Sequence, residues 1–172
     1  MAGPMEWIDE VAAESLSELA SVPDVVCLEP DRDQLRMMVV DDDEGFRTML
    51  RWWLADEDVR VVAEAADGEM AVELAANASP DLILMDLRMP RMGGLEAARK
   101  IKDSLPYTQV IMLSAYGDTS LRYAAEDAGV FSYLAKGCTP EVLWQTIRFA
   151  WMYKRNLEAR TGLHDWSPHA LN

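Results

Sequence analysis

Residues 81–90 read DLILMDLRMP, and the centre of this stretch is a run of four apolar residues that ends at Asp86. A short run that is apolar at every position is typical of a parallel strand that is covered on both faces of its sheet. Asp86 would then stand at the carboxyl end of that strand. In open α/β sheets, ligands bind beside this edge.

Short apolar runs recur on both sides of this one and alternate with stretches of helical periodicity. The runs predict strands over residues 37–40, 59–63, 82–85, 110–113 and 130–135. The stretches between and after them predict helices over residues 44–55, 68–77, 93–103, 119–128 and 139–153. We therefore expect an α/β fold, with a doubly wound five-stranded parallel sheet and helices on both faces.

The composition predicts one folded domain with additional sequence at each end. Half of the 172 residues are hydrophobic and 27% are charged, which suits a chain that buries a core. We expect an N-terminal extension over residues 1–35, a folded domain over 36–155 and a polar tail over 156–172. Apolar residues on one face of the extension predict an amphipathic helix: Ile8, Val11, Ala12, Leu16 and Leu19.

The net charge of −14 excludes several classes of function. An acidic surface repels phosphate backbones, so direct binding to nucleic acid or to an anionic membrane is not expected. No apolar run is long enough to span a bilayer, and the acidic N-terminus is not typical of a secretion signal. The two cysteines, Cys27 and Cys138, match no metal or redox spacing. We therefore expect a cytoplasmic location.

Reactive side chains follow four of the predicted strands. The acidic run 41–43 follows the first strand, and Asp86, Ser114 and Lys136 follow the third, fourth and fifth. Crowded carboxylates repel one another, and a hard cation such as Mg²⁺ makes their ionised forms tolerable. A hydroxyl and an ammonium suit the oxygens of a phosphoryl group, which a carboxylate can itself accept. The combination predicts a site for phosphoryl chemistry, whereas each residue alone has an ordinary interpretation. For Asp43 and Glu44, a loop residue or a helix cap is favoured.

At these residues the sequence resembles the receiver domain of bacterial two-component response regulators. The similar segments are residues 38–43, 81–90, 93–94, 110–115 and 129–136, and the resemblance extends over about residues 36–153. It implies a flavodoxin-like sheet of order 2-1-3-4-5. It also implies a signalling module that receives a phosphoryl group from a histidine kinase or a phosphotransfer protein. Such a module catalyses only its own phosphorylation and dephosphorylation and is not an enzyme for other substrates.

The resemblance assigns roles to individual residues. Asp86 would accept the phosphoryl group, while Ser114 and Lys136 would bind its oxygens. Tyr133, three residues before Lys136, would rotate inward when Ser114 moves and so act as a switch. A buried tyrosine whose hydroxyl simply needs a partner is the alternative for Tyr133.

The implied cofactor is Mg²⁺. Asp42, Asp86 and the backbone carbonyl of Arg88 would bind the ion directly, and Asp41 would hold it largely through water. Arg88 and Tyr116 follow Asp86 and Ser114 by two residues, where side chains tune the lifetime of the phosphoryl group. Both are bulky here, so we expect slow dephosphorylation.

The chain departs from the family pattern in two respects. Gly137 stands where many relatives have proline; it and the segment 61–68 resemble the branch that precedes a helix-turn-helix DNA-binding domain. The residues after 155 are too few for such a domain, so we expect a lone receiver or a fragment.

The last predicted helix carries two apolar stripes. Leu143, Ile147 and Ala150 form the expected core stripe, and Trp144 and Trp151 form a second one. The second stripe favours a surface for a downstream protein target or for a homodimer. Alternatively, the tail or the N-terminal helix covers these tryptophans.

Two other functions compete with the receiver interpretation. A haloacid-dehalogenase-type phosphatase would use Asp41 and Asp43 as its D-x-D pair, but Gly45 stands where its threonine is expected and Asp86 is left without a role. A receiver used only as a phosphorylation-independent scaffold is the other alternative, although the acceptor, the acids, the hydroxyl and the lysine are all present.

Overall fold

The computed structural model describes residues 34–55, 58–115 and 122–161. The chain divides into two units, residues 1–32 and 33–172, and the described residues belong to the second. Four predicted features lie outside the described residues: the N-terminal amphipathic helix, Tyr116, the start of the helix expected from residue 119, and the tail from residue 162.

The described residues contain a five-stranded sheet in which every neighbouring pair is parallel. The strands are β1 (Leu35–Val40), β2 (Val59–Ala65), β3 (Leu82–Asp86), β4 (Gln109–Ser114) and β5 (Ser132–Ala135). Their spatial order is β2-β1-β3-β4-β5. This order confirms the predicted flavodoxin-like, doubly wound sheet, whose order reverses at β1 and β3.

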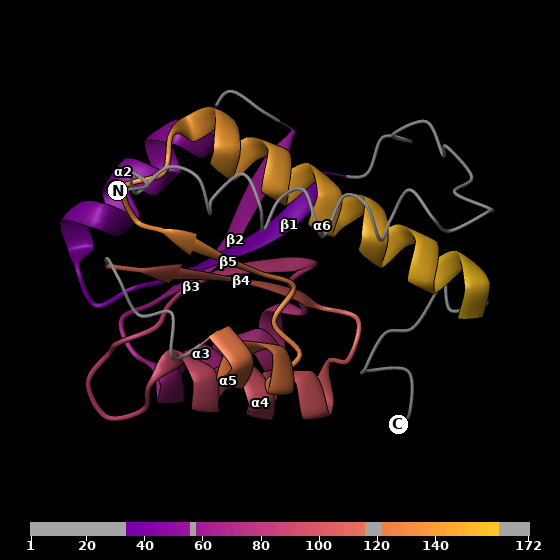
Figure 1. The fold of residues 1–172 in the computed structure, drawn as a ribbon, viewed down its shortest axis with the longest axis horizontal. Coiled ribbons are helices and arrows are strands. Elements are labelled where there is room, and N and C mark those ends of the chain that lie inside the picture. Colours follow the sequence, from indigo (N-terminus) through magenta and orange to yellow (C-terminus); the bar gives the residue numbers. More distant parts are fainter. Residues whose placement is uncertain (1–33, 56–57, 116–121, 162–172) are drawn as a thin grey trace, which may run out of the picture. The chain divides into compact units, whose positions relative to one another are not determined.

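Helices cover both faces of the sheet, as Figure 1 shows. They are α2 (Glu44–Leu54), α3 (Gly68–Ala78), α4 (Gly94–Ser104), α5 (Arg122–Asp127) and α6 (Pro140–Thr161). Helices α2 and α6 lie on one face, and α3, α4 and α5 lie on the other (Figure 1).

Among the described residues, two buried clusters, one on each face of the sheet, form the core. Met38, Val40 and Ile83 belong to the cluster under α3 and α4, whereas Met37 and Val39 belong to the cluster under α2 and α6. Successive side chains of a strand point to opposite faces, so a strand that is buried on both faces must be apolar throughout. This is the physical reason for the uninterrupted apolar runs in the sequence.

Aspartates begin two of the helices. Asp43 caps α2, because its Oδ1 accepts hydrogen bonds from the N–H groups of Gly45 (2.8 Å) and Phe46 (3.1 Å). Asp67 caps α3 by accepting from the Met70 N–H at 3.0 Å. Asp43, expected to be a loop residue or a helix cap, is thus a helix cap.

Helix α6 ends at Thr161, beyond the predicted end near residue 153. The polar sequence after residue 155 suggested the earlier end. In the structure, Lys154 and Glu158 form an ion pair one turn apart (2.7 Å). The Lys154 Nζ also lies 2.6 Å from Asp81 Oδ1. Burial opposes the charge of Lys154, but the two carboxylates more than offset it and raise its pKa. These contacts anchor the later turns of α6 to the start of β3.

The predicted core stripe of α6, Leu143, Ile147 and Ala150, is buried. Trp144 and Trp151 are half-buried and pack against the same cluster, so these tryptophans contribute in part to the domain's own core. No helix within the described residues is long and apolar enough to cross a membrane.

Candidate functional site

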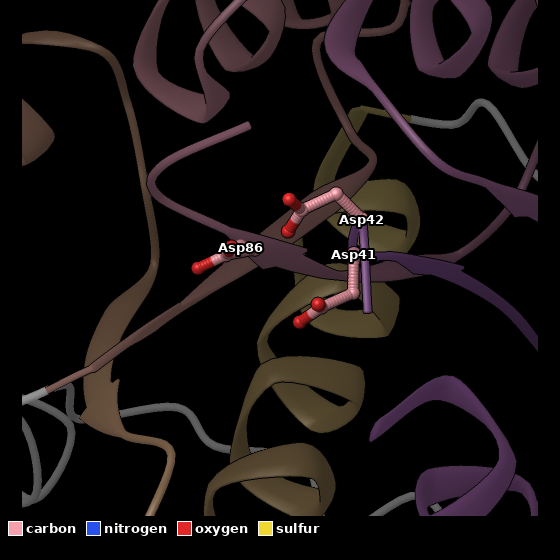
Figure 2. Close-up of side chains that lie close together, drawn as sticks. All are labelled: Asp41, Asp42 and Asp86. Atoms are coloured by element: carbon pink, nitrogen blue, oxygen red, sulfur yellow. The ribbon is translucent and has the colours of Figure 1, made fainter. Parts of the chain in front are cut away.

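Three carboxylates meet at the carboxyl ends of two adjacent strands. Asp41 and Asp42 follow β1, and Asp86 is the last residue of β3, which pairs with β1. One carboxylate oxygen from each residue lies within 4.8 Å of the others. Figure 2 shows the three side chains, which project from these neighbouring strand ends. The predicted convergence of Asp41, Asp42 and Asp86 is therefore present.

Burial gives these carboxylates different environments. Asp41 and Asp86 are buried, at 1% and 5% exposed, whereas Asp42 is open to solvent. Burial raises the pKa of Asp86, the ammonium of Lys136 partly opposes this, and the charge of Asp41 adds to it. The Arg88 N–H also donates a hydrogen bond to the Asp86 carboxylate. The cluster holds more negative charge than Lys136 can neutralise.

Lys136 extends from the end of β5 toward the buried carboxylates. Its Nζ lies 2.7 Å from Asp41 Oδ2 and 3.1 Å from Asp86 Oδ2. Burial opposes its charge, but these two carboxylates more than offset that effect and raise its pKa. Lys136 is therefore a protonated donor beside the Asp86 carboxylate at neutral pH.

Ser114 occupies the end of β4, next to both β3 and β5. It is 2% exposed, and its Oγ is a buried atom without a hydrogen-bond partner within the described part of the chain. The same holds for the hydroxyl of Tyr133 on β5. A buried hydroxyl without a partner is costly, so these atoms favour a site that gains a ligand or a rearrangement.

The residues fit a hard divalent cation. Mg²⁺ prefers oxygen ligands and usually takes one or two carboxylates together with water and phosphate. Asp41, Asp42 and Asp86 offer three such oxygens at a place where their mutual repulsion is otherwise incompletely compensated. Because Asp42 is exposed, water can reach a bound ion from the side on which Asp42 lies.

Two contacts at this edge were not predicted from the sequence. Arg47 donates a hydrogen bond from Nη1 to the backbone carbonyl of Asp41 at 2.6 Å. The ring of Phe46 lies under the Lys136 ammonium, with 4.8 Å between Nζ and the ring centre. The helical periodicity of residues 44–55 predicted only that Phe46 lies in a helix. An aromatic residue near the start of the helix after an acidic strand end was the available signal.

Hydrogen bonds near both ends hold the loop between β3 and α4 in place. The Gly94 N–H donates to the Leu87 carbonyl at 3.0 Å, and the Gly68 N–H donates to the Met92 carbonyl at 3.1 Å. Arg91 forms an ion pair with the buried carboxylate of Asp67. This loop carries Arg88, so the contacts fix the backbone that follows Asp86.

The remaining predicted site residues are placed as follows. Asp43 caps α2 through its Oδ1, as described above. The side chain of Arg88 is exposed, two residues after Asp86. Tyr116 lies outside the described residues.

Comparisons with known proteins agree with this geometry. Residues 37–148 match the family model described as response regulator receiver domain. An uncharacterized transcriptional regulatory protein of Bacillus subtilis, YxjL, is 37% identical over 124 residues, which are 70% of this chain and 56% of that protein. The response regulator UvrY of Escherichia coli is 37% identical over 122 residues, with the same coverage of both chains. The chain thus spans just over half the length of these curated relatives.

Solved structures show the same fold. The receiver domain of the putative response regulator NarL from Mycobacterium tuberculosis is 34% identical, with a TM-score of 0.64 over 69% of this chain and 97% of that one. A chain from the CheX–CheY–BeF₃–Mg²⁺ complex of Borrelia burgdorferi is 26% identical, with a TM-score of 0.63 over 66% of this chain and 86% of that one.

Proposed function

Because the chain belongs to the response regulator receiver family of two-component systems, we propose that it stores a signal as a phosphoryl group on Asp86. The donor is a histidine kinase, a phosphotransfer protein or a small phosphodonor. The observation that carries this proposal is the position of Asp86: a buried carboxylate beside two further acids, with the Lys136 ammonium 3.1 Å from its Oδ2.

The reaction uses Asp86 as the nucleophile. One of its carboxylate oxygens attacks phosphorus, a new O–P bond forms, and the bond from phosphorus to the donor histidine nitrogen breaks. The histidine leaves with the electron pair of that bond and takes up a proton. Lys136 and Ser114 donate to the phosphoryl oxygens, where negative charge gathers in the transition state. Water later hydrolyses the acyl phosphate and restores the carboxylate.

Asp41, Asp42 and Asp86 would hold Mg²⁺, together with the backbone carbonyl of Arg88. When bound, the ion supplies positive charge that offsets the repulsion between the carboxylates and the incoming phosphoryl group. The fit rests on the three convergent oxygens of this chain. A structural relative that was solved as a complex with BeF₃ and Mg²⁺ supports the same assignment.

The phosphoryl group would act through Ser114 and Tyr133. Its oxygen gives the buried Ser114 hydroxyl a partner, and the repacking around Ser114 reaches Tyr133 on β5. The surface that changes comprises α5, β5 and α6, where a downstream protein or a second copy of the chain would bind. With a net charge of −14, this receiver would transmit its signal by protein contacts rather than by touching nucleic acid itself.

Acetyl phosphate with Mg²⁺ tests the proposal. By intact-mass spectrometry, wild-type protein should gain one phosphoryl group that is labile to base, and Asp86→Asn should gain none. Asp103→Asn, an exposed acid on α4, is the matched control and should behave as wild type. The bulky Arg88 and Tyr116 predict slow decay in the same samples, and alanine at either position should accelerate it.

The same experiment separates the alternatives. A phosphorylation-independent scaffold gains no phosphoryl group under any condition. A phosphatase releases phosphate continuously and loses that turnover on Asp41→Asn and Asp43→Asn. Phosphorylation that persists unchanged in Asp86→Asn would overturn the assignment of the acceptor.

A further inference from the structure

We propose that Phe46 is a positioning residue, whose ring holds the Lys136 ammonium against Asp41 and Asp86. The inference rests on the proposed function, because the positioned ammonium is the one that would meet the phosphoryl oxygens. The Lys136 Nζ lies 4.8 Å from the centre of the Phe46 ring, inside the roughly 6 Å range of a cation–π contact. The two carboxylates lie 2.7 and 3.1 Å from the same nitrogen.

The Phe46 ring is fixed by its surroundings. Its backbone N–H donates to the Asp43 cap at 3.1 Å, which sets the first turn of α2. Its side chain packs against the core cluster shared by α2 and α6, which includes Leu50 and Leu143. A ring that is held by both its backbone and its packing can define the position of a mobile partner.

Lys136 is such a partner. Its backbone N–H is anchored to the Ser114 carbonyl at 2.8 Å, but its charge sits at the end of a flexible four-carbon chain. The next residue is Gly137, which contributes no side chain. Lys136 keeps 20% of its side chain exposed, so solvent competes with the carboxylates for the ammonium. The Phe46 ring favours the inward position because its negative face attracts the cation.

Three variants test this role. Phe46→Leu keeps an apolar side chain but removes the aromatic face, and Phe46→Tyr restores that face. Trp53→Leu is the matched control, because Trp53 lies two turns further along α2 and packs against the same cluster. A loss of core packing would affect both leucine variants, whereas a loss of the cation–π contact affects only Phe46→Leu.

The first readout does not depend on phosphorylation. In protein labelled with ¹³C-lysine, the ε-CH₂ signal of Lys136, assigned with Lys136→Arg, should be shifted upfield by the ring current of Phe46. The shift should persist in Phe46→Tyr and Trp53→Leu and disappear in Phe46→Leu. An unshifted Lys136 signal in the wild type would overturn the inference.

The second readout is phosphorylation by acetyl phosphate with saturating Mg²⁺. Phe46→Leu should raise the KM for acetyl phosphate about 3- to 10-fold, the scale of one partly exposed cation–π contact, while Phe46→Tyr and Trp53→Leu stay within about twofold of wild type. An unchanged KM in Phe46→Leu, or an equal rise in Trp53→Leu, would overturn the role of the ring. If wild type itself gains no phosphoryl group, the proposed function fails, and the lysine spectra alone decide whether the ring holds the ammonium.

Discussion

Asp86 is an ionisable group in a place that resists ionisation. It is only 5% exposed, so its carboxylate loses most of the hydration it has in the unfolded chain. Lys136 compensates for part of this cost, but Asp41 shares the same ammonium and adds its own negative charge. The folded protein therefore carries the energetic cost of burying the Asp86 carboxylate, the proposed phosphoacceptor.

This cost predicts how stability depends on pH in the absence of Mg²⁺. The pKa of Asp86 is raised in the folded protein, mainly by burial, so the folded state holds this proton more tightly than the unfolded state does. The stability that this tighter proton binding gives the folded state is complete below the usual aspartate pKa. It is lost as the pH rises through the raised pKa of Asp86. Asp86→Asn removes this loss, so at pH 7 the variant should be more stable than wild type by about 1 kcal/mol.

Urea unfolding with EDTA between pH 4 and pH 7 measures the effect. The advantage of Asp86→Asn should shrink as the pH falls, because wild-type Asp86 regains its proton. Asp103→Asn is the control with an exposed carboxylate and should show no comparable trend. A variant that is less stable than wild type across the whole range would show that the ion pair with Lys136 outweighs the burial of Asp86.

At the scale of elements, the position of Asp86 depends on how closely α4 approaches β3. A Cβ atom at Gly94 would lie 2.1 Å from the Asp86 carbonyl oxygen and 3.1 Å from the Met112 sulfur. Only a residue without a side chain permits this approach. The first residue of α4 is thus packed on the backbone of Asp86 itself.

Gly94→Ala should therefore destabilise the protein by about 1–3 kcal/mol, the range for overpacking a tight contact, and should also weaken Mg²⁺ binding by moving the Asp86 backbone. Gly137→Ala is the control, because a Cβ atom there meets nothing within 4 Å, and it should stay within about 0.5 kcal/mol of wild type. Chemical denaturation gives both values. Equal effects of the two substitutions would contradict the close-approach explanation.

The elements that the sequence predicted well are those whose periodicity has a single physical cause. The strands β1, β3 and β4 are buried on both faces, so they are apolar nearly throughout, and the short length of these runs favours strands over helices. Helix α6 was predicted too short because its last turns depend on a contact with Asp81, which lies far away in the sequence. Such pairings leave no local periodic signal.

The same distinction applies to the site. The convergence of Asp41, Asp42, Asp86 and Lys136 could be predicted because parallel strands bring their carboxyl ends to one edge. The contact between Phe46 and Lys136 could not, because it depends on how α2 lies across that edge. The strand pattern determines which residues stand at the carboxyl edge of the sheet. The packing of α2 determines which of its side chains lie across that edge.

At the scale of the whole molecule, the dominant property is the net charge of −14. Charges of one sign repel one another throughout the folded chain, and dissolved salt screens that repulsion over about 10 Å at 0.1 M. NaCl should therefore stabilise this protein to some degree. A stabilising effect of MgCl₂ alone would say nothing about a specific site.

A comparison of MgCl₂ with NaCl at equal ionic strength separates the effect of the metal site from the effect of screening. With MgCl₂ at roughly ten times the dissociation constant, wild type should be more stable than in NaCl of the same ionic strength by about 1.4 kcal/mol, the linkage expected for one ion that binds only the folded state.

Asp42→Asn should lose this increment but keep the response to NaCl, because Asp42 is exposed and its loss barely affects folding. Asp103→Asn removes an equal charge from an exposed position on α4 and should keep both responses. If Asp42→Asn and Asp103→Asn reduce the increment equally, Mg²⁺ acts only through the overall charge of the chain, and the carboxylates at the ends of β1 and β3 do not form a metal site.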